Sequence, residues 1–254
     1  MLHIIISGCN GHMGRAVSAL SASDPEVEVV AGFDILGASI HEYPVFASPA
    51  LFDGEADVVI DFSSPAALSP LLTFAVEKHI PLVLATTGYT QEQVTATKMV
   101  STRVPIFRSA NMSLGINVML ELVKRAAELL GETCDIEIVE RHHRRKVDAP
   151  SGTALMLAQA IQEGLPYQPE YVFERHSIRK PRGGKEIGFS AVRGGTIAGE
   201  HQVIFAGHDE VFELHHSASS REIFASGAIQ AAKFLGAVTE PGWYSMSDLM
   251  KAIM

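Results

Sequence analysis

The chain has 254 residues, 47% hydrophobic and 19% charged, which suits an ordered globular protein with one large core or two smaller ones. Its formal net charge of -9 argues against nucleic acid or a membrane surface as a partner, because both require a basic face. Cys9 and Cys134 are too few for a disulfide framework and lack metal-site spacing, so we expect a reducing, cytoplasmic environment and no bound metal.

The first half alternates short apolar strands with helical patterns. Residues 2–7 form a β-branched run that is too short for a signal peptide or membrane span, so we expect a buried strand. Ser64 and Pro65 are suited to begin a later helix as its cap and first turn. Further strands are expected at 27–33, 57–62, 81–85 and 105–108. This alternation predicts an α/β domain with a doubly wound, Rossmann-type parallel sheet.

The segment after the first strand, residues 8–14, is close to a dinucleotide-binding fingerprint. It reads Gly-Cys-Asn-Gly-His-Met-Gly, with Asn10 at the usual place of the second glycine, where asparagine tolerates left-handed backbone angles. A glycine-rich turn at a helix start lets a pyrophosphate approach backbone N–H groups. Asp34, at the end of the second strand, provides an acceptor for a ribose hydroxyl. The pattern predicts a nicotinamide dinucleotide site; the alternative is a glycine-rich turn without nucleotide.

Asp34 also bears on the choice between the two nicotinamide cofactors. Its carboxylate repels a 2′-phosphate, and the following Ile35 and Leu36 provide no arginine to neutralise one. A protonated His12 near a phosphate would act in the opposite direction. We therefore expect NADH to be preferred over NADPH.

The second half changes its periodicity. A helix at 114–130 is followed by a strand at 135–140 and a helix at 153–163. Three more strands are expected at 186–193, 199–206 and 210–216, separated by the hairpin signals Gly194-Gly195 and Gly207-His208-Asp209. These elements predict an α+β domain with a mixed, mostly antiparallel sheet and helices on one face.

The chain is accordingly divided into three parts. We expect a dinucleotide-binding Rossmann domain at 1–113, a substrate-binding and oligomerisation domain at 114–221, and C-terminal helices at 222–254 that return to the first domain. Within the second part, residues 165–185 are rich in Pro, Gly and charge, which suits either a mobile loop or an interface arm.

A basic run stands out in this acidic chain. Residues 141–146 read Arg-His-His-Arg-Arg-Lys, and Ser151 directly afterwards is suited to cap a helix while leaving the N–H groups of Gly152 and Thr153 free. Cations beside a helix N-terminus favour a small carboxylate or phosphate, and lysine and histidine can also deliver protons. The segment predicts an anion-binding catalytic site.

Three other interpretations of the basic run are weaker. A solvated loop leaves its junction with the Ser151 helix start unexplained. A metal site would need His142 and His143 to converge, but neighbouring residues of a strand point to opposite faces. Nucleic-acid binding would require aromatic residues and a broader basic surface.

The sequence resembles the dihydrodipicolinate reductase family, also called 4-hydroxy-tetrahydrodipicolinate reductases, of the diaminopimelate route to lysine. The resemblance is carried by residues 140–154, Glu-Arg-His-His-Arg-Arg-Lys-Val-Asp-Ala-Pro-Ser-Gly-Thr-Ala. Shorter matches occur at 8–14, Asp61-Phe62, Thr86-Thr87-Gly88, 110–113 and 218–221.

The resemblance implies a reaction and assigns roles to residues. Hydride would pass from NAD(P)H to 4-hydroxy-tetrahydrodipicolinate, a small dicarboxylate, with loss of water to give tetrahydrodipicolinate. His142 would be the general acid/base and Lys146 a proton donor, while His143, Gly152 and Thr153 would hold the substrate. The implied cofactor contacts are Gly8, Cys9, Asn10, Gly11, His12, Met13, Asp34, Ala85, Thr86, Thr87, Ser109, Ala110, Asn111 and Met112. The resemblance also implies a homotetramer joined through the second-domain sheets.

Four positions depart from the family pattern: Asn10, Ile35, Ala85 and Arg141. None involves His142 or Lys146, so they bear on cofactor preference and not on the reaction. Two other functions are carried as alternatives. A nucleotide-sensing regulator would keep the Rossmann domain without chemistry, and a homoserine-dehydrogenase-like reductase would share the two-domain plan but lack the basic run.

Overall fold

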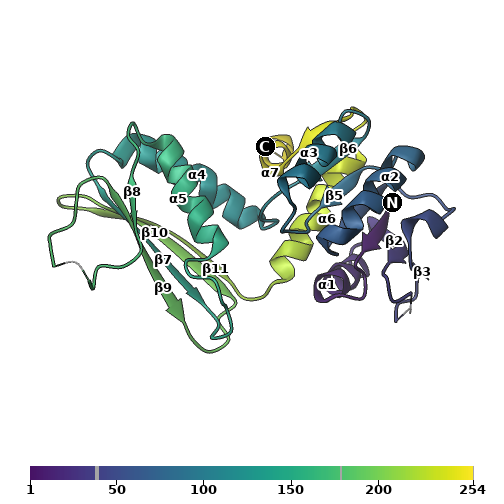
Figure 1. The fold of residues 1–254 in the computed structure, drawn as a ribbon, viewed down its shortest axis with the longest axis horizontal. Coiled ribbons are helices and arrows are strands. Elements are labelled where there is room, and N and C mark those ends of the chain that lie inside the picture. Colours follow the sequence, from purple (N-terminus) through teal and green to yellow (C-terminus); the bar gives the residue numbers. More distant parts are fainter. Residues whose placement is uncertain (38–39, 178, 254) are drawn as a thin grey trace. The chain divides into compact units, whose positions relative to one another are not determined.

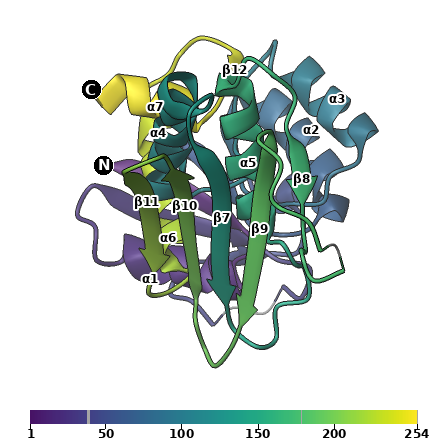
Figure 2. The same ribbon diagram turned by 90° about the vertical axis from the view of Figure 1, so that its left-hand side faces the viewer.

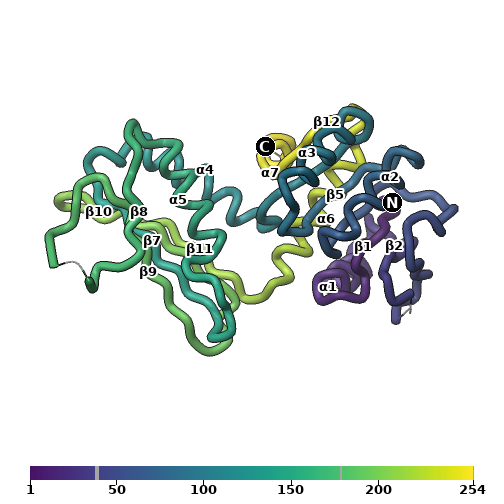
Figure 3. The backbone as a smooth tube through the Cα atoms, viewed as in Figure 1, coloured from purple at the N-terminus to yellow at the C-terminus, as the bar shows by residue number. Residues whose placement is uncertain are grey.

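The computed structural model describes residues 1–37, 40–177 and 179–253, and the chain forms two compact units (Figure 1). Unit 1 consists of Met1–Ser113 with Glu222–Met254, and unit 2 of Leu114–Arg221. The chain therefore passes between the units twice, as its path in Figure 3 shows. No helix in the described ranges is long and apolar enough to cross a membrane.

Unit 1 is built on a parallel sheet of seven strands in the order β12-β6-β5-β4-β1-β2-β3. The Rossmann-type parallel sheet expected from the sequence is confirmed. Its strands are β1 (Leu2–Ser7), β2 (Val27–Phe33), β3 (Val45–Phe46), β4 (Val58–Asp61), β5 (Leu82–Leu84), β6 (Pro105–Arg108) and β12 (Gly242–Tyr244). Its helices are α1 (His12–Ser21), α2 (Leu68–Lys78), α3 (Gln91–Val100), α6 (Glu222–Gly236) and α7 (Met246–Ile253).

Both faces of this sheet are buried, which explains why its strands are continuously apolar. Along β1, Ile4 and Ile6 belong to a core cluster that includes residues of α1, α6 and α7. Ile5 points to the other face and belongs to a second cluster with α2. Successive side chains of β1 therefore point to opposite faces of the sheet and pack into two separate cores.

The strand order reverses between β1 and β4, since β2 and β3 extend the sheet in one direction and β4, β5 and β6 in the other. Ligands of open parallel sheets bind beyond the carboxyl ends of the strands at such a reversal. The glycine turn after β1 lies at this point. The chain before α2 differs in detail from expectation: Pro65–Ala67 forms a short 3₁₀ turn, and the Ser64 side chain makes no capping bond.

Unit 2 contains a five-stranded sheet in the order β11-β10-β7-β9-β8, with the helices α4 and α5 packed behind it in the view of Figure 2. Apolar residues of both helices share a core with β7, β9 and β10, so one face of the sheet is covered. The elements of this unit are α4 (Leu114–Leu130), β7 (Asp135–His142), α5 (Gly152–Gly164), β8 (Glu170–Val172), β9 (Glu186–Arg193), β10 (Gly199–Ala206) and β11 (Val211–Ala218).

This sheet is mixed, as expected: β10 pairs antiparallel with β11 and β7, and β9 pairs parallel with β7 and β8. The hairpin expected at Gly194-Gly195 does not form. β7 lies between β9 and β10, and the connection carrying these glycines crosses its end, where the Gly194 N–H donates to the His142 carbonyl at 2.9 Å. The second glycine signal, Gly207-His208-Asp209, does join an antiparallel pair, β10 and β11.

The segment expected to be a mobile loop or an interface arm contains strand β8 and an arginine clamp. Arg182 bonds to the carboxylates of Asp135 and Glu137, and Arg175 bonds to Glu137 and Glu186. These contacts hold Arg175 and Arg182 on the face of the sheet away from α5, whereas Leu165 and Tyr171 pack against the core on the α5 side. Residue 178 lies outside the described residues.

Candidate active site

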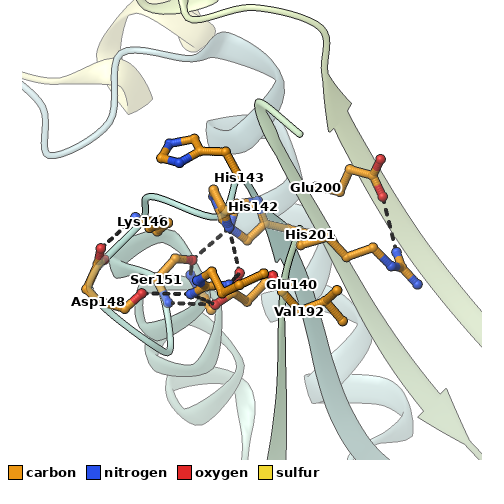
Figure 4. Close-up of polar contacts among 12 residues, drawn as sticks. Glu140, His142, His143, Lys146, Asp148, Ser151, Val192, Glu200 and His201 are labelled. Atoms are coloured by element: carbon orange, nitrogen blue, oxygen red, sulfur yellow. Dashed lines mark hydrogen bonds and ion pairs between the residues drawn. The ribbon is translucent and has the colours of Figure 1, made fainter. Parts of the chain in front are cut away.

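The basic run begins on the last residues of β7, the central strand of unit 2, and Figure 4 shows how its side chains lie. Glu140 and His142 are two residues apart on this strand, so both point toward the covered face of the sheet. His142 Nδ1 lies 2.5 Å from Glu140 Oε2, within hydrogen-bonding distance. Only 1% of the Glu140 side chain is exposed, so this carboxylate is buried beside the imidazole.

Two further groups hold the Glu140 carboxylate. Arg193, the last residue of β9, donates to both carboxylate oxygens at 2.7 and 2.6 Å, and the Ser151 N–H donates to Oε1 at 3.1 Å. Burial alone would raise the pKa of Glu140, but the hydrogen bonds from Arg193 and His142 outweigh it and hold the pKa below its ordinary value. The carboxylate is therefore ionised at neutral pH.

The pKa of His142 is also lowered, chiefly by burial, although Glu140 acts in the opposite direction. Lys146 and Arg193 contribute to the lowering as nearby cations. The imidazole is therefore mainly neutral at neutral pH and can accept a proton, as a general acid/base requires.

Ser151 is the cap of α5, as the sequence predicts. Its Oγ accepts from the Ala154 N–H at 3.2 Å. The Gly152 N–H, expected to be free, instead faces the Asp148 carboxylate. The pKa of Asp148 lies below its ordinary value because Lys146 donates a hydrogen bond to it, with the Gly152 N–H as a further donor. The loop thus folds its own carboxylate onto the helix N-terminus, where the anion site was expected.

The side chains of Lys146 and His143 have different partners. The Lys146 ammonium lies 2.8 Å from Asp148 Oδ1. His143 points away from the Glu140 cluster in Figure 4, and its Nε2 lies 3.1 Å from Arg221 Nη2. Because a guanidinium only donates, this nitrogen is the acceptor. The His143 Nδ1 is buried without a hydrogen-bond partner in the described part of the chain.

His201, on the neighbouring strand β10, packs edge-on against His142 with ring centroids 5.1 Å apart. Its Nε2 lies 2.9 Å from Ser151 Oγ. Burial lowers the pKa of His201 to about 3, with the nearby His142 as a further cause. A neutral His201 adds no second positive charge beside His142 at physiological pH.

Because the pKa of His201 is lowered in the folded protein, we expect this residue to make the fold less stable as the pH falls. An unfolded histidine titrates near pH 6.5, so below that pH the unfolded chain binds a proton that folded His201 does not, and stability falls as pH falls. Between pH 7 and pH 5 we expect His201 to account for about 2 kcal/mol of this loss. In urea unfolding at both pH values, His201→Gln should reduce the difference by that amount. The exposed His208, changed to Gln, serves as control, and an undiminished pH effect in His201→Gln would contradict the assignment.

In unit 1 the glycine turn after β1 has the backbone shape expected of a dinucleotide loop. Gly8 has a φ of +76°, and a Cβ at Gly14 would lie 2.2 Å from the Gly8 carbonyl oxygen. The turn delivers the chain into α1, and Asp34 at the end of β2 accepts from the Asn10 N–H at 3.2 Å. The carboxylate thus lies at the turn, where a ribose hydroxyl would need it. These residues fit a dinucleotide.

The other candidate cofactor residues divide by exposure. Gly11, His12, Thr87 and Ala110 are exposed, whereas the Cys9 and Met112 side chains belong to the core. Burial raises the pKa of the Cys9 thiol to about 11, with Asp34 as a further cause, so this cysteine is neutral. Cys9 and Met112 can therefore contribute only backbone groups to a ligand. Ser109 bonds to the backbone N–H and carbonyl of Asn111, which stiffens the last of these loops.

Family models match both halves of the chain. Residues 2–112 match the model described as dihydrodipicolinate reductase, N-terminus, and residues 115–250 match dihydrodipicolinate reductase, C-terminus. The chain belongs to the dihydrodipicolinate reductase family. The resemblance recognised in its sequence is thereby confirmed.

Individual relatives agree with the family. The chain is 53% identical to the 4-hydroxy-tetrahydrodipicolinate reductase of Caldanaerobacter subterraneus subsp. tengcongensis over 251 residues, 99% of each protein. It is 44% identical to the enzyme of that name from Clostridium tetani, over 99% of this chain and 98% of the relative. A dipicolinate-bound dihydrodipicolinate reductase from Paenisporosarcina sp. TG-14 has a similar structure, with a TM-score of 0.80 and 25% identity over 96% of this chain and 98% of that one.

The site of this family member includes residues to which the sequence assigned no role. Glu140 had a detectable signal, because residues two apart on a strand share a face with His142. Arg193 and His201 had none, since they reach the site only because β9 and β10 flank β7. Within the described ranges no cluster of three or more His, Cys, Asp or Glu residues could hold a metal ion.

Proposed function

We propose that the chain reduces 4-hydroxy-tetrahydrodipicolinate with a nicotinamide cofactor and with loss of water, giving tetrahydrodipicolinate. The observation that carries the proposal is the cluster of His142, Lys146 and the α5 N-terminus in a chain of this reductase family. The family favours an enzyme over a nucleotide-sensing regulator and over a homoserine-dehydrogenase-like reductase. The bound dipicolinate of the Paenisporosarcina relative supports a small dicarboxylate as substrate.

The residues of unit 2 would bind the substrate and move its protons. Lys146, His143 and the N–H groups of Gly152 and Thr153 are proposed to hold the carboxylates, with the substrate replacing Asp148 as partner of Lys146 and the Gly152 N–H. His142 would exchange a proton with the substrate through Nε2, since its Nδ1 is bonded to Glu140. Lys146 would donate a second proton and stabilise developing negative charge.

The residues of unit 1 would hold the dinucleotide, which supplies hydride when bound. The N–H groups at the start of α1, which no side chain caps, suit its pyrophosphate, and Asp34 suits its ribose. The direct test is oxidation of NADH by the purified protein with freshly prepared 4-hydroxy-tetrahydrodipicolinate. Oxidation that depends on the substrate is expected, and its absence with both NADH and NADPH would refute the proposal.

NADH is proposed as the preferred cofactor because of Asp34. The exposed Ile35 and Leu36 beside it offer no cation for a 2′-phosphate. The ratio of kcat/KM for NADH to that for NADPH should exceed one, and Asp34→Asn should lower it by about tenfold or more, because it removes charge repulsion and keeps an acceptor oxygen. Asp53→Asn, at an exposed loop position, is the matched control. A native preference for NADPH would overturn this choice.

Unit 2 is also proposed to join the subunits of a homotetramer. The face of its sheet opposite α4 and α5 carries no helix, as Figure 2 shows, and its residues alternate with those of the core. Val192 is 44% exposed and Val211 61% exposed on strands of this sheet, which is apolar surface that an interface would cover. Light scattering of the purified protein should give four times the mass of one chain. A monomer at micromolar concentration would contradict the proposal.

A further inference from the structure

Both oxygens of the Glu140 carboxylate accept hydrogen bonds from neighbouring groups. Oε2 accepts from His142 Nδ1 and Arg193 Nη1, while Oε1 accepts from Arg193 Nη2 and the Ser151 N–H. All four distances lie between 2.5 and 3.1 Å. The side chain is 1% exposed, so water cannot replace these donors easily. A carboxylate held from two sides in this way has one orientation.

An ionised carboxylate has no hydrogen to donate, and this determines the protonation of the neighbouring imidazole. The His142 nitrogen that faces Glu140 must carry a hydrogen, so neutral His142 has its lone pair on Nε2. Gly199 on β10 leaves space beside it, since a Cβ at that position would lie 3.1 Å from Nε2.

Arg193 makes a second connection that reaches the other proposed proton donor. Its Nη2 also donates to the Asp148 carbonyl at 2.7 Å, and the Asp148 carboxylate binds Lys146 at 2.8 Å. The residue after Arg193 donates its N–H to the His142 carbonyl. One guanidinium therefore connects the strand that carries His142 with the loop that carries Lys146.

We propose that Glu140 and Arg193 are positioning residues that fix His142 as the Nδ1–H tautomer, with Nε2 available for proton transfer, and hold the Lys146 loop beside it. The proposal rests on the proposed function for the identity of the proton acceptor. Glu140 and Arg193 would act through His142 and the Lys146 loop, without contacting the substrate.

The pair should influence the charge of His142 as well as its orientation. The groups facing this imidazole are Glu140 on its own strand, Arg193 on β9, His201 on β10 and Lys146 on the following loop. Glu140 is the negative one among them. Replacing it by glutamine removes the group that favours imidazolium, so the pKa of His142 should fall further.

The test uses Glu140→Gln and Arg193→Lys in the full-length protein. Nitrogen NMR of the histidine rings reports the tautomer and pKa of His142 without any turnover; His142→Gln identifies its signals. In the parent protein we expect the Nδ1–H form. In Glu140→Gln we expect a mixture of tautomers, because an amide can donate as well as accept, and a lower titration midpoint.

Steady-state kinetics with the dicarboxylate substrate supply the second measurement. Glu140→Gln should lower kcat by at least about tenfold, change the substrate KM by less than about threefold, and move the limb of the pH profile that follows His142 to lower pH. Arg193→Lys keeps the charge but not the two-pronged bond, so its loss of kcat should be smaller.

Glu137→Gln is the matched control. Glu137 lies on the same strand and binds Arg175 and Arg182, but on the opposite face of the sheet. It should leave the His142 tautomer, its titration and the pH profile unchanged. If Glu140→Gln does not fold, as judged by circular dichroism, Arg193→Lys and the tautomer of the parent protein decide the question.

The outcomes separate the two proposals. A parent protein that shows Nδ1–H His142 but no substrate-dependent oxidation would refute the proposed function and leave the tautomer assignment standing. An active parent protein whose His142 carries its hydrogen on Nε2 would overturn the positioning role. So would Glu140→Gln or Arg193→Lys with unchanged kcat and pH profile.

Discussion

Replacing His142 by glutamine should lower kcat by about two to four orders of magnitude, the usual contribution of a positioned general acid/base. Glutamine keeps a polar side chain of similar length but cannot exchange a proton near neutral pH. The affinity for NADH, measured by fluorescence titration, should change by less than about twofold, because the proposed dinucleotide site consists of unit 1 residues and His142 belongs to unit 2. The variant therefore separates chemistry from cofactor binding.

The control for this experiment is His208→Gln. His208 lies in the turn between β10 and β11, where 94% of its side chain is exposed and its Nδ1 lies 2.9 Å from Asp209 Oδ1. It should retain the parent kcat. Near-normal turnover by His142→Gln would remove His142 from the catalytic role, whereas an equal loss in both variants would point to a general sensitivity of the sheet.

Gly14→Ala should have the second large effect, on stability and cofactor binding together. The added Cβ would lie 2.2 Å from the Gly8 carbonyl oxygen and 2.6 Å from Cys9 Cα, and these backbone atoms cannot move without opening the turn. We expect the free energy of unfolding to fall by about 3 kcal/mol, the upper range for an overpacked site. The Kd for NADH should rise by more than about tenfold because the start of α1, proposed to bind the pyrophosphate, shifts with the turn.

A second glycine at a helix start provides the comparison. At Gly152, the first residue of α5, a Cβ would meet no heavy atom within 4 Å. Gly152→Ala should therefore change the unfolding free energy, measured in urea, by no more than about 1 kcal/mol. Equal stabilities for Gly14→Ala and the parent protein would show that the turn is less closely packed than its backbone distances require.

The parts of the fold that depend on local pattern could be predicted. The runs at Leu2–Ser7 and Val27–Phe33 have these bounds in the structure because each is apolar, β-branched and closed by a turn. The helix Leu114–Leu130 likewise follows its apolar period. Short elements could not be found, since β3 and β12 have two and three residues and owe their pairing to neighbours already in the sheet.

The order of the strands in the sheet of unit 2 could not be predicted from local sequence pattern. Gly194-Gly195 has the composition of a hairpin turn, and composition does not reveal that β7 occupies the place between the strands it connects. For the same reason, part of the candidate site could not be predicted. His142 and Lys146 could be selected from one continuous motif, whereas Arg193 and His201 lie 53 and 61 residues from Glu140 along the chain, with no shared pattern.

The two passages of the chain between its units have a consequence for biosynthesis. One face of the unit 1 sheet is covered by α6 and α7, whose Ala225, Ile229 and Leu249 belong to the same core as Ile4 and Ile6. A ribosome completes these helices only after the whole of unit 2, roughly 6 to 30 seconds after β6 at ordinary elongation rates. During that interval the nascent sheet exposes an apolar face. We expect it to be a site for chaperone binding until the last helices emerge.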